Sequence, residues 1–192
     1  MIAEPQPKTR RIREAVTAAE LAQLPDTERS ELIRGELVEM APPPGWDHGR
    51  STNRIGARAS VFVFDHDLGD VPAAETGFLL ARDPDTVLAP DFAFVSKERI
   101  VPSDGKPYLP LCPDLVMETV SPSDTRREVA LKTETWLRYG ARMVWILDPV
   151  RRTLTIHRSD APFRVLGPED TLSGEDVLPG FSIALASVFP PS

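Results

Sequence analysis

The sequence lacks the features that would place the protein outside the cytoplasm or in a membrane. It contains one cysteine, Cys112, so it can form neither an internal disulfide nor a metal site built from several cysteines. No stretch approaches about 18 consecutive apolar residues, and residues 1–13 hold no apolar run that could act as a secretion signal. We therefore expect a cytoplasmic protein that does not associate with a membrane.

An excess of positive charge is also missing. The chain has 22 Lys and Arg against 29 Asp and Glu, and its formal net charge is −7. The protein as a whole therefore repels phosphate backbones, and any contact with nucleic acid must be local.

The composition is typical of one folded domain. The chain has 192 residues, of which 41% are hydrophobic and 27% charged, which argues against disorder throughout and against a fibrous repeat. The 20 prolines favour extended segments and turns over an all-helical bundle. We expect residues 1–13 to form a flexible N-terminal arm and residues 14–192 a single domain.

The pattern of apolar residues predicts a mixed α/β fold. Thr17 and Glu20 have the spacing of a helix capping box, and Arg34-Gly35 is typical of a turn between two short strands in residues 31–39. Further strands are expected at 78–81, 87–95, 114–121 and 143–147, helices at 48–67 and 123–139, and a C-terminal β-meander at 152–157, 163–166 and 181–185.

Two carboxylates fall among apolar residues in the predicted strands. Asp91 shares a strand face with Ala89 and Ala93, and Glu118 is placed in the same way in the next strand. An ionised carboxylate is too costly to leave unpaired in an apolar setting, so each needs a cation, a hydrogen-bond partner or a raised pKa. If the two strands pair, the carboxylates converge, and a hard divalent cation would suit them.

Lys132 lies on the apolar stripe of the helix predicted at 123–139, between Val129 and Trp136. Such a lysine can serve a buried site. It can equally form a surface ion pair with Glu128, four residues earlier, while its stem covers apolar neighbours. The pattern alone leaves both interpretations open.

Several segments resemble known nucleases. Pro90-Asp91, followed by Glu118 in Leu-Val-Met-Glu-Thr-Val-Ser-Pro-Ser, is similar to the PD-(D/E)XK nuclease superfamily. The chain more narrowly resembles the Uma-two family (Uma2) of restriction-endonuclease-like proteins, which is widespread in bacteria. The segments that carry this likeness occur in order over about residues 15 to 160, and they are 31–38, His48, 90–91, 113–123, Lys132 and 139–149.

The resemblance implies a restriction-endonuclease-like fold, in which a mixed β-sheet flanked by helices presents Asp91 and Glu118 to Mg²⁺ or Mn²⁺. The backbone carbonyl of Thr119 is a further ligand in this interpretation. The usual Glu-x-Lys motif would place lysine at position 120, where this chain has valine. In the Uma-two pattern Lys132 takes that place. Glu31 matches an acidic position that completes the metal shell or orients the lysine, although a solvated strand residue explains it equally well.

The implied chemistry is hydrolysis of phosphodiester bonds. The metal held by Asp91 and Glu118 would activate a water molecule and neutralise charge at the phosphate, while the Lys132 ammonium orients the attacking water.

Candidate contacts to nucleic acid lie on both predicted helices. His48 matches a recurrent family position, and a capping or packing role is as plausible for it. Arg50 and Arg54 belong to a basic stripe that can contact a phosphate backbone or simply form a solvated face.

Ser123 and Arg126 lie at the expected start of the second helix. Backbone N–H groups and a guanidinium there can hold a phosphate, although an ordinary helix cap explains the pattern nearly as well.

We therefore predict a metal-dependent endonuclease that acts on DNA. A homodimer is expected because two-strand cleavage in this superfamily commonly uses paired active sites. The alternatives are a catalytically inactive nucleic-acid or protein-interaction module on the same fold, and a hydrolase of another phosphoester. The negative net charge favours the alternatives.

Overall fold

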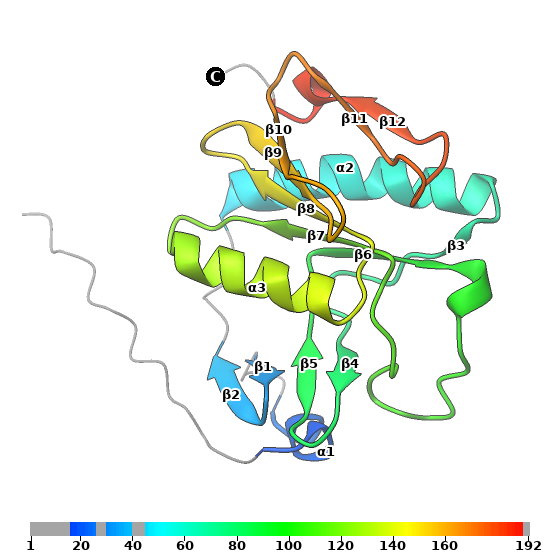
Figure 1. Ribbon diagram of the computed structural model, residues 1–192, viewed down its shortest axis with the longest axis vertical. Coiled ribbons are helices and arrows are strands. Elements are labelled where there is room, and N and C mark those ends of the chain that lie inside the picture. Colours follow the sequence, from blue (N-terminus) through cyan, green and yellow to red (C-terminus); the bar gives the residue numbers. More distant parts are fainter. Residues whose placement is uncertain (1–15, 26–29, 40–44, 190–192) are drawn as a thin grey trace, which may run out of the picture.

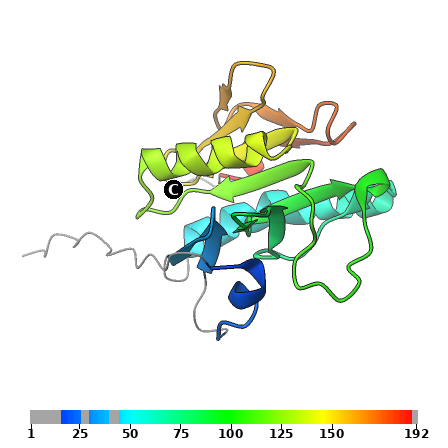
Figure 2. The same ribbon diagram turned by 60° about the horizontal axis from the view of Figure 1, so that its bottom comes forward.

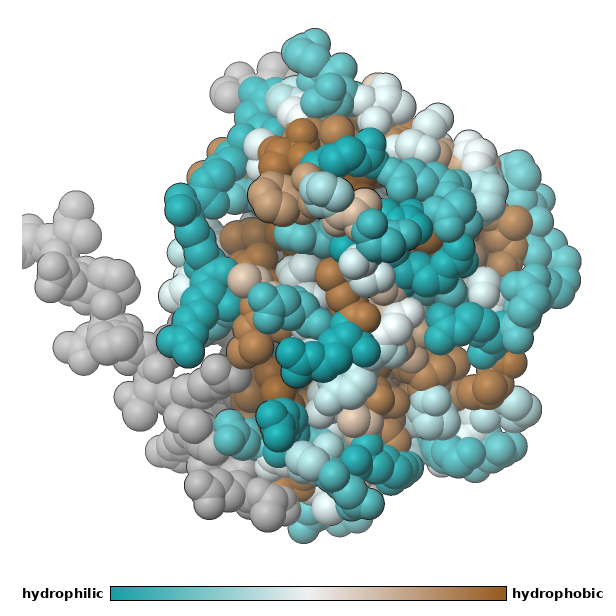
Figure 3. Space-filling view, viewed as in Figure 1, coloured by the Kyte–Doolittle hydropathy of each residue, from teal (hydrophilic) through white to brown (hydrophobic). Residues whose placement is uncertain are grey.

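The computed structural model describes residues 16–25, 30–39 and 45–189, so the N-terminal arm predicted for residues 1–13 lies outside the described residues. Within them the chain forms a six-stranded sheet, a four-stranded sheet and a two-stranded sheet, with two long helices (Figure 1). In the view of Figure 1, hydrophilic side chains divide the apolar surface into small patches (Figure 3).

The six-stranded sheet forms the centre of the fold, with strand order β10-β9-β8-β7-β6-β3. Strands β7 and β8 are parallel, and the other neighbours are antiparallel. All six residues of β8 are buried, as expected from its continuous apolar run. The strands are β3 (Gly69–Asp70), β6 (Phe92–Ser96), β7 (Leu115–Thr119), β8 (Met143–Asp148), β9 (Thr153–His157) and β10 (Arg164–Leu166).

Two long helices cover opposite faces of this sheet, and Figure 2 shows strand β7 between them. Helix α2 (Trp46–Asp65) places Ile55, Ala59 and Val63 in one core cluster together with alternate residues of β6 and β7. Helix α3 (Arg126–Arg138) places Trp136 in a second cluster on the other face. The fold is thus the predicted mixed sheet flanked by helices.

The four-stranded sheet is antiparallel, with order β2-β1-β5-β4. Its strands are β1 (Ser30–Ile33), β2 (Glu36–Glu39), β4 (Phe78–Ala81) and β5 (Thr86–Leu88). The short helix α1 (Ala18–Leu21) begins at the predicted capping box of Thr17 and Glu20 and packs against this sheet. The turn at Arg34-Gly35 connects β1 and β2, as predicted.

The prediction of one strand over residues 87–95 is wrong. Strand β5 ends at Leu88 in the four-stranded sheet, and β6 begins at Phe92 in the six-stranded sheet. Pro90 lies between them and has no N–H to donate to a ladder, which explains the interruption. Asp91 therefore lies in the crossover between the two sheets and not on the face of a strand.

Two further expectations need correction. Helix α3 begins at Arg126 and not at Ser123, because Thr125 and Glu128 form the capping box of this helix. Strands β9 and β10 extend the main sheet as a meander, but β12 (Ser182–Ala184) pairs with β11 (Thr171–Ser173) in a separate two-stranded sheet. The short segments η1 (Lys97–Arg99) and η2 (Leu185–Ser187) are 3₁₀ helices.

A buried ion pair fixes the start of β7. Asp114 is 1% exposed, and its carboxylate lies 2.9 Å from Arg99 Nη1 and accepts a 2.8 Å hydrogen bond from the Ser96 N–H. We expect Asp114→Ala to lower the free energy of unfolding by about 2 kcal/mol, because it leaves the Ser96 N–H unpaired and takes the carboxylate away from Arg99, which keeps its hydrogen bond to the Cys112 carbonyl. Urea denaturation measures this change.

The control for Asp114 is Lys106→Ala, which removes the partner of Asp104 from an exposed pair. We expect it to cost less than about 1 kcal/mol. Equal effects of the two substitutions would contradict a structural role for the Asp114 pair.

The single cysteine is inert in the folded protein. Cys112 is buried, and burial raises the pKa of its thiol to about 12. At pH 8 the native protein should therefore react with a disulfide reagent about 10³-fold more slowly than the protein unfolded in guanidinium, since only the thiolate reacts. Comparable native and unfolded rates would show that this segment opens readily.

Candidate active site

Four ionisable side chains meet where the two larger sheets approach each other. Glu31 comes from β1, Asp91 from the crossover before β6, Glu118 from β7 and Lys132 from α3. Because Phe92 of β6 lies opposite Met117 of β7, the residue before Phe92 lies beside the residue after Met117. The sequence predicted this convergence; the catalytic roles of the four residues stay predictions.

Lys132 bridges two carboxylates. Its Nζ lies 2.9 Å from Glu31 Oε1 and 3.0 Å from Glu118 Oε2, so it reaches into the fold and not along the surface. Burial would lower the pKa of Lys132, but the charges of Glu118 and Glu31 outweigh it and hold the pKa above its usual range. The Lys132 side chain therefore stays protonated, so it can donate hydrogen bonds but cannot act as a base.

Glu118 is held by two donors from α3. Oε2 faces Lys132, and Oε1 accepts a 2.7 Å hydrogen bond from the Trp136 indole N–H. Burial raises the pKa of Glu118 to about 8; the Lys132 charge opposes this rise, and the charges of Glu31 and Asp91 add to it. A buried carboxylate with a strongly raised pKa beside a specific charged partner marks a candidate functional group.

Glu31 is also engaged twice. It is 6% exposed, and its Oε1 accepts a 2.9 Å hydrogen bond from the Ala89 N–H as well as facing Lys132. Glu31 thus joins the four-stranded sheet to the cluster. The alternative of a solvated strand residue is wrong.

Asp91 and Thr119 form the other half of the site. The Thr119 N–H donates a 2.7 Å hydrogen bond to Asp91 Oδ2, and the Thr119 carbonyl lies 2.9 Å from His48 Nε2. That nitrogen also lies 3.5 Å from Asp91 Oδ2. Since a carbonyl oxygen only accepts, His48 Nε2 must carry a proton. The Thr52 and Thr119 hydroxyls share a 2.7 Å hydrogen bond.

His48 therefore lies inside the site instead of on a surface that faces nucleic acid. Its side chain is 10% exposed. Sequence analysis did not identify Trp136 or Thr52 as site residues. The sequence feature that could have identified Trp136 is its position four residues after Lys132, because this spacing places both side chains on one helical face.

The remaining candidates for contact with nucleic acid do not converge on the cluster. Arg50 pairs with Asp47, and Arg54 donates to the Ser187 carbonyl at 2.9 Å, so α2 shows no free basic stripe at these positions. Ser123 and Arg126 are exposed, and among the described residues Arg126 has no ion-pair partner.

The donors present fit a hard divalent cation. Asp91, Glu118 and the Thr119 carbonyl supply only oxygen, which Mg²⁺ and Mn²⁺ prefer. In residues 16–25, 30–39 and 45–189, no three His, Cys, Asp or Glu side chains are grouped as a ready metal site. The predicted metal site needs only two carboxylate side chains, because Mg²⁺ usually keeps several water ligands. Each carboxylate oxygen also has a second lone pair that can face the metal.

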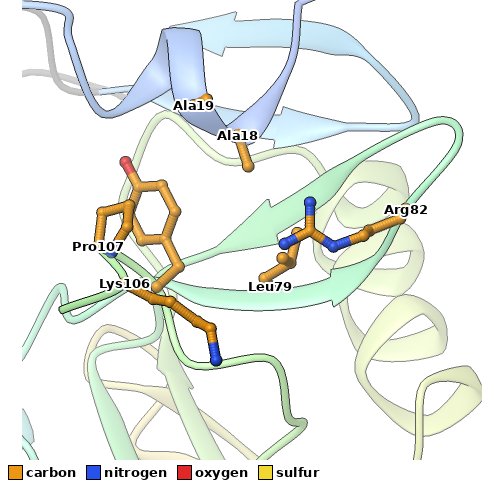
Figure 4. A pocket seen from close by; sticks show the side chains of 7 residues that line it. Ala18, Ala19, Leu79, Arg82, Lys106 and Pro107 are labelled. Carbon is orange, nitrogen blue, oxygen red and sulfur yellow. The ribbon is translucent and has the colours of Figure 1, made fainter. Parts of the chain in front are cut away.

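Two pockets in the described part of the chain include none of the residues of this cluster. One lies beside α1, and its lining includes Leu79, Arg82, Lys106 and Tyr108 (Figure 4). The other is a mostly apolar hollow lined by residues such as Phe78, Val95 and Leu111. Neither contains any of the four ionisable residues of the cluster, so neither enters the chemistry of the site.

Comparison with known proteins defines the class. The family model described as "Uma2: Putative restriction endonuclease" matches residues 18–186, and the chain belongs to this family. The crystal structure of a "putative nuclease belonging to DUF820" from Anabaena variabilis is similar, with a TM-score of 0.78 and 20% sequence identity over 91% of this chain and 97% of that one.

The structural match confirms the predicted fold class, and the family match confirms the predicted resemblance. No curated protein matches the sequence. Among the described residues no helix is both long enough and apolar enough to cross a bilayer.

Proposed function

We propose that the protein is a metal-dependent endonuclease that hydrolyses phosphodiester bonds in DNA. The observation that carries the proposal is the position of Lys132 between Glu31 and Glu118, with Asp91 held beside them by the Thr119 N–H. Membership of a family described as restriction endonucleases supports the reaction class and DNA as the substrate.

Each residue of the site has a separate role in the proposed reaction. Asp91, Glu118 and the Thr119 carbonyl would hold Mg²⁺ or Mn²⁺, and the metal would supply Lewis-acid chemistry to the phosphodiester there. The Lys132 ammonium donates hydrogen bonds to the attacking water and to the developing negative charge. Glu31 keeps Lys132 charged and in place. His48 fixes the Thr119 carbonyl, and the exposed Arg126 is available to a phosphate of the substrate.

A homodimer in the cytoplasm completes the proposal. Two copies would place one site on each strand of a duplex, which suits cleavage of both strands. Sedimentation equilibrium of the free protein gives the oligomeric state directly.

An inactive binding module on the same fold is the second candidate. The observation that favours it is that Lys132 already neutralises part of the cluster without a metal, while the net charge of −7 opposes the approach of a polyanion. Metal binding and cleavage separate the two candidates.

Titration calorimetry with Mn²⁺ tests the metal site. We expect wild-type protein to bind Mn²⁺, and Asp91→Ala and Glu118→Ala to bind it more than about tenfold more weakly, because each loses an oxygen ligand. Glu134→Ala removes an exposed carboxylate from α3 and serves as the control. Equal affinities in all four proteins would remove the metal site from the account.

Cleavage of plasmid DNA tests Lys132. We expect Lys132→Met to lower the rate by about 100-fold or more while Mn²⁺ binding persists, because the ammonium stabilises the transition state without holding the metal. Lys106→Met, at an exposed lysine paired with Asp104, should cut like wild type. Normal cutting by Lys132→Met would show that the lysine is structural, and an inactive wild type with Mn²⁺ would favour the binding module.

A further inference from the structure

Two donors from adjacent turns of α3 hold the two oxygens of one carboxylate. Lys132 Nζ lies 3.0 Å from Glu118 Oε2, and Trp136 Nε1 lies 2.7 Å from Glu118 Oε1. The two residues are four positions apart, so their side chains lie on one face of the helix. Lys132 has a proposed role in orienting the attacking water, whereas the proposed reaction gives the Trp136 indole no role.

We propose that Trp136 is a positioning residue that fixes the orientation of the Glu118 carboxylate for metal binding. This inference rests on the proposed function and deepens it, because it explains how Glu118 stays available to a cation while Lys132 lies beside it.

The indole ring is held rigidly. Trp136 is fully buried in the core cluster on the α3 face of the sheet, where Val116 and Val144 also pack. Its own carbonyl accepts hydrogen bonds from the Ala141 N–H at 3.0 Å and from Cys112 Sγ at 3.6 Å. Packing of the buried ring therefore restricts how far the N–H can follow the Glu118 carboxylate.

The indole hydrogen bond limits how the carboxylate can turn. The terminal torsion of a glutamate is broad, so without a second contact Glu118 can rotate and offer both oxygens to the Lys132 ammonium. With Oε1 held by the indole, only Oε2 faces the lysine, and one lone pair on each oxygen stays available. Because the indole is neutral, it holds the carboxylate without adding positive charge that would repel a metal ion.

The chain contains a matched control for this role. Trp145 on β8 is also fully buried, but it belongs to the core cluster on the α2 face, and its Nε1 contacts Met143 Sδ at 3.0 Å. Trp145→Phe therefore removes the same atoms as Trp136→Phe and leaves the ionisable cluster intact. A purely structural effect of losing a buried indole should appear in both variants.

The experiment compares Mn²⁺ affinity by calorimetry in the full chain for wild type, Trp136→Phe and Trp145→Phe, with urea denaturation of each. We expect Trp136→Phe to weaken Mn²⁺ binding by about tenfold or more, in the range found when a residue that supports a metal ligand is lost, and Trp145→Phe to change it less than about twofold. In cleavage, Trp136→Phe should need more Mn²⁺ for half-maximal rate and approach the wild-type rate at saturation.

Equal Mn²⁺ affinity of wild type and Trp136→Phe would overturn the inference and leave the proposed function standing. Absence of Mn²⁺ binding in wild type would overturn both. If Trp136→Phe does not fold, replacing Trp136 by benzothienylalanine keeps the shape of the ring and removes only the N–H, and the same loss of affinity is expected. Unchanged affinity in that protein would also overturn the inference.

Discussion

The site depends on one electrostatic constraint, a partly buried ammonium that must be balanced by carboxylates from separate parts of the fold. Lys132 has 24% of its side chain exposed and lies within 3.0 Å of both Glu31 and Glu118. Losing one of these carboxylates would leave charge uncompensated in a poorly hydrated place. The contact therefore joins β1 of the smaller sheet, β7 of the central sheet and helix α3 at one point.

The carboxylates of the site carry more negative charge than the Lys132 ammonium neutralises, which favours the binding of a cation. Two carboxylates, Glu31 and Glu118, flank one ammonium, and burial raises the pKa of Glu118 to about 8, with smaller contributions from the charges of Glu31 and Asp91. A divalent cation would offset the negative charge of Glu118 and Asp91. The hydrogen bond of Trp136 holds the Glu118 carboxylate, and that of His48 holds the Thr119 carbonyl. The apolar core on each face of the sheet in turn holds these two donor side chains.

Much of the fold was predictable from local patterns. The apolar run at 143–147 predicted the interior strand β8, and the spacing of Thr17 and Glu20 predicted the start of α1. The break of residues 87–95 into two strands was missed because alternation of side chains continues through Pro90, although proline cannot donate to a ladder. The separate pairing of β11 with β12 depends on long-range packing that no local pattern encodes.

In the candidate site, the charged residues and Thr119 were predictable from the sequence, whereas Trp136 and Thr52 were not. Asp91, Glu118 and Lys132 stood out because charge among apolar residues is costly, and Glu31 followed from the family resemblance. Trp136 was interpreted only as core, because a buried tryptophan needs no further explanation until its N–H partner is known. For His48 the sequence left open a contact with nucleic acid and a capping or packing role, because its contact with the Thr119 carbonyl depends on how α2 packs beside the end of β7.

The most direct test of the account is anomalous diffraction from crystals of the protein soaked in Mn²⁺. We expect an anomalous peak within coordination distance of both Asp91 and Glu118, where the Thr119 carbonyl and Lys132 also lie. A well-ordered site with no anomalous peak, or Mn²⁺ bound only elsewhere on the protein, would contradict it.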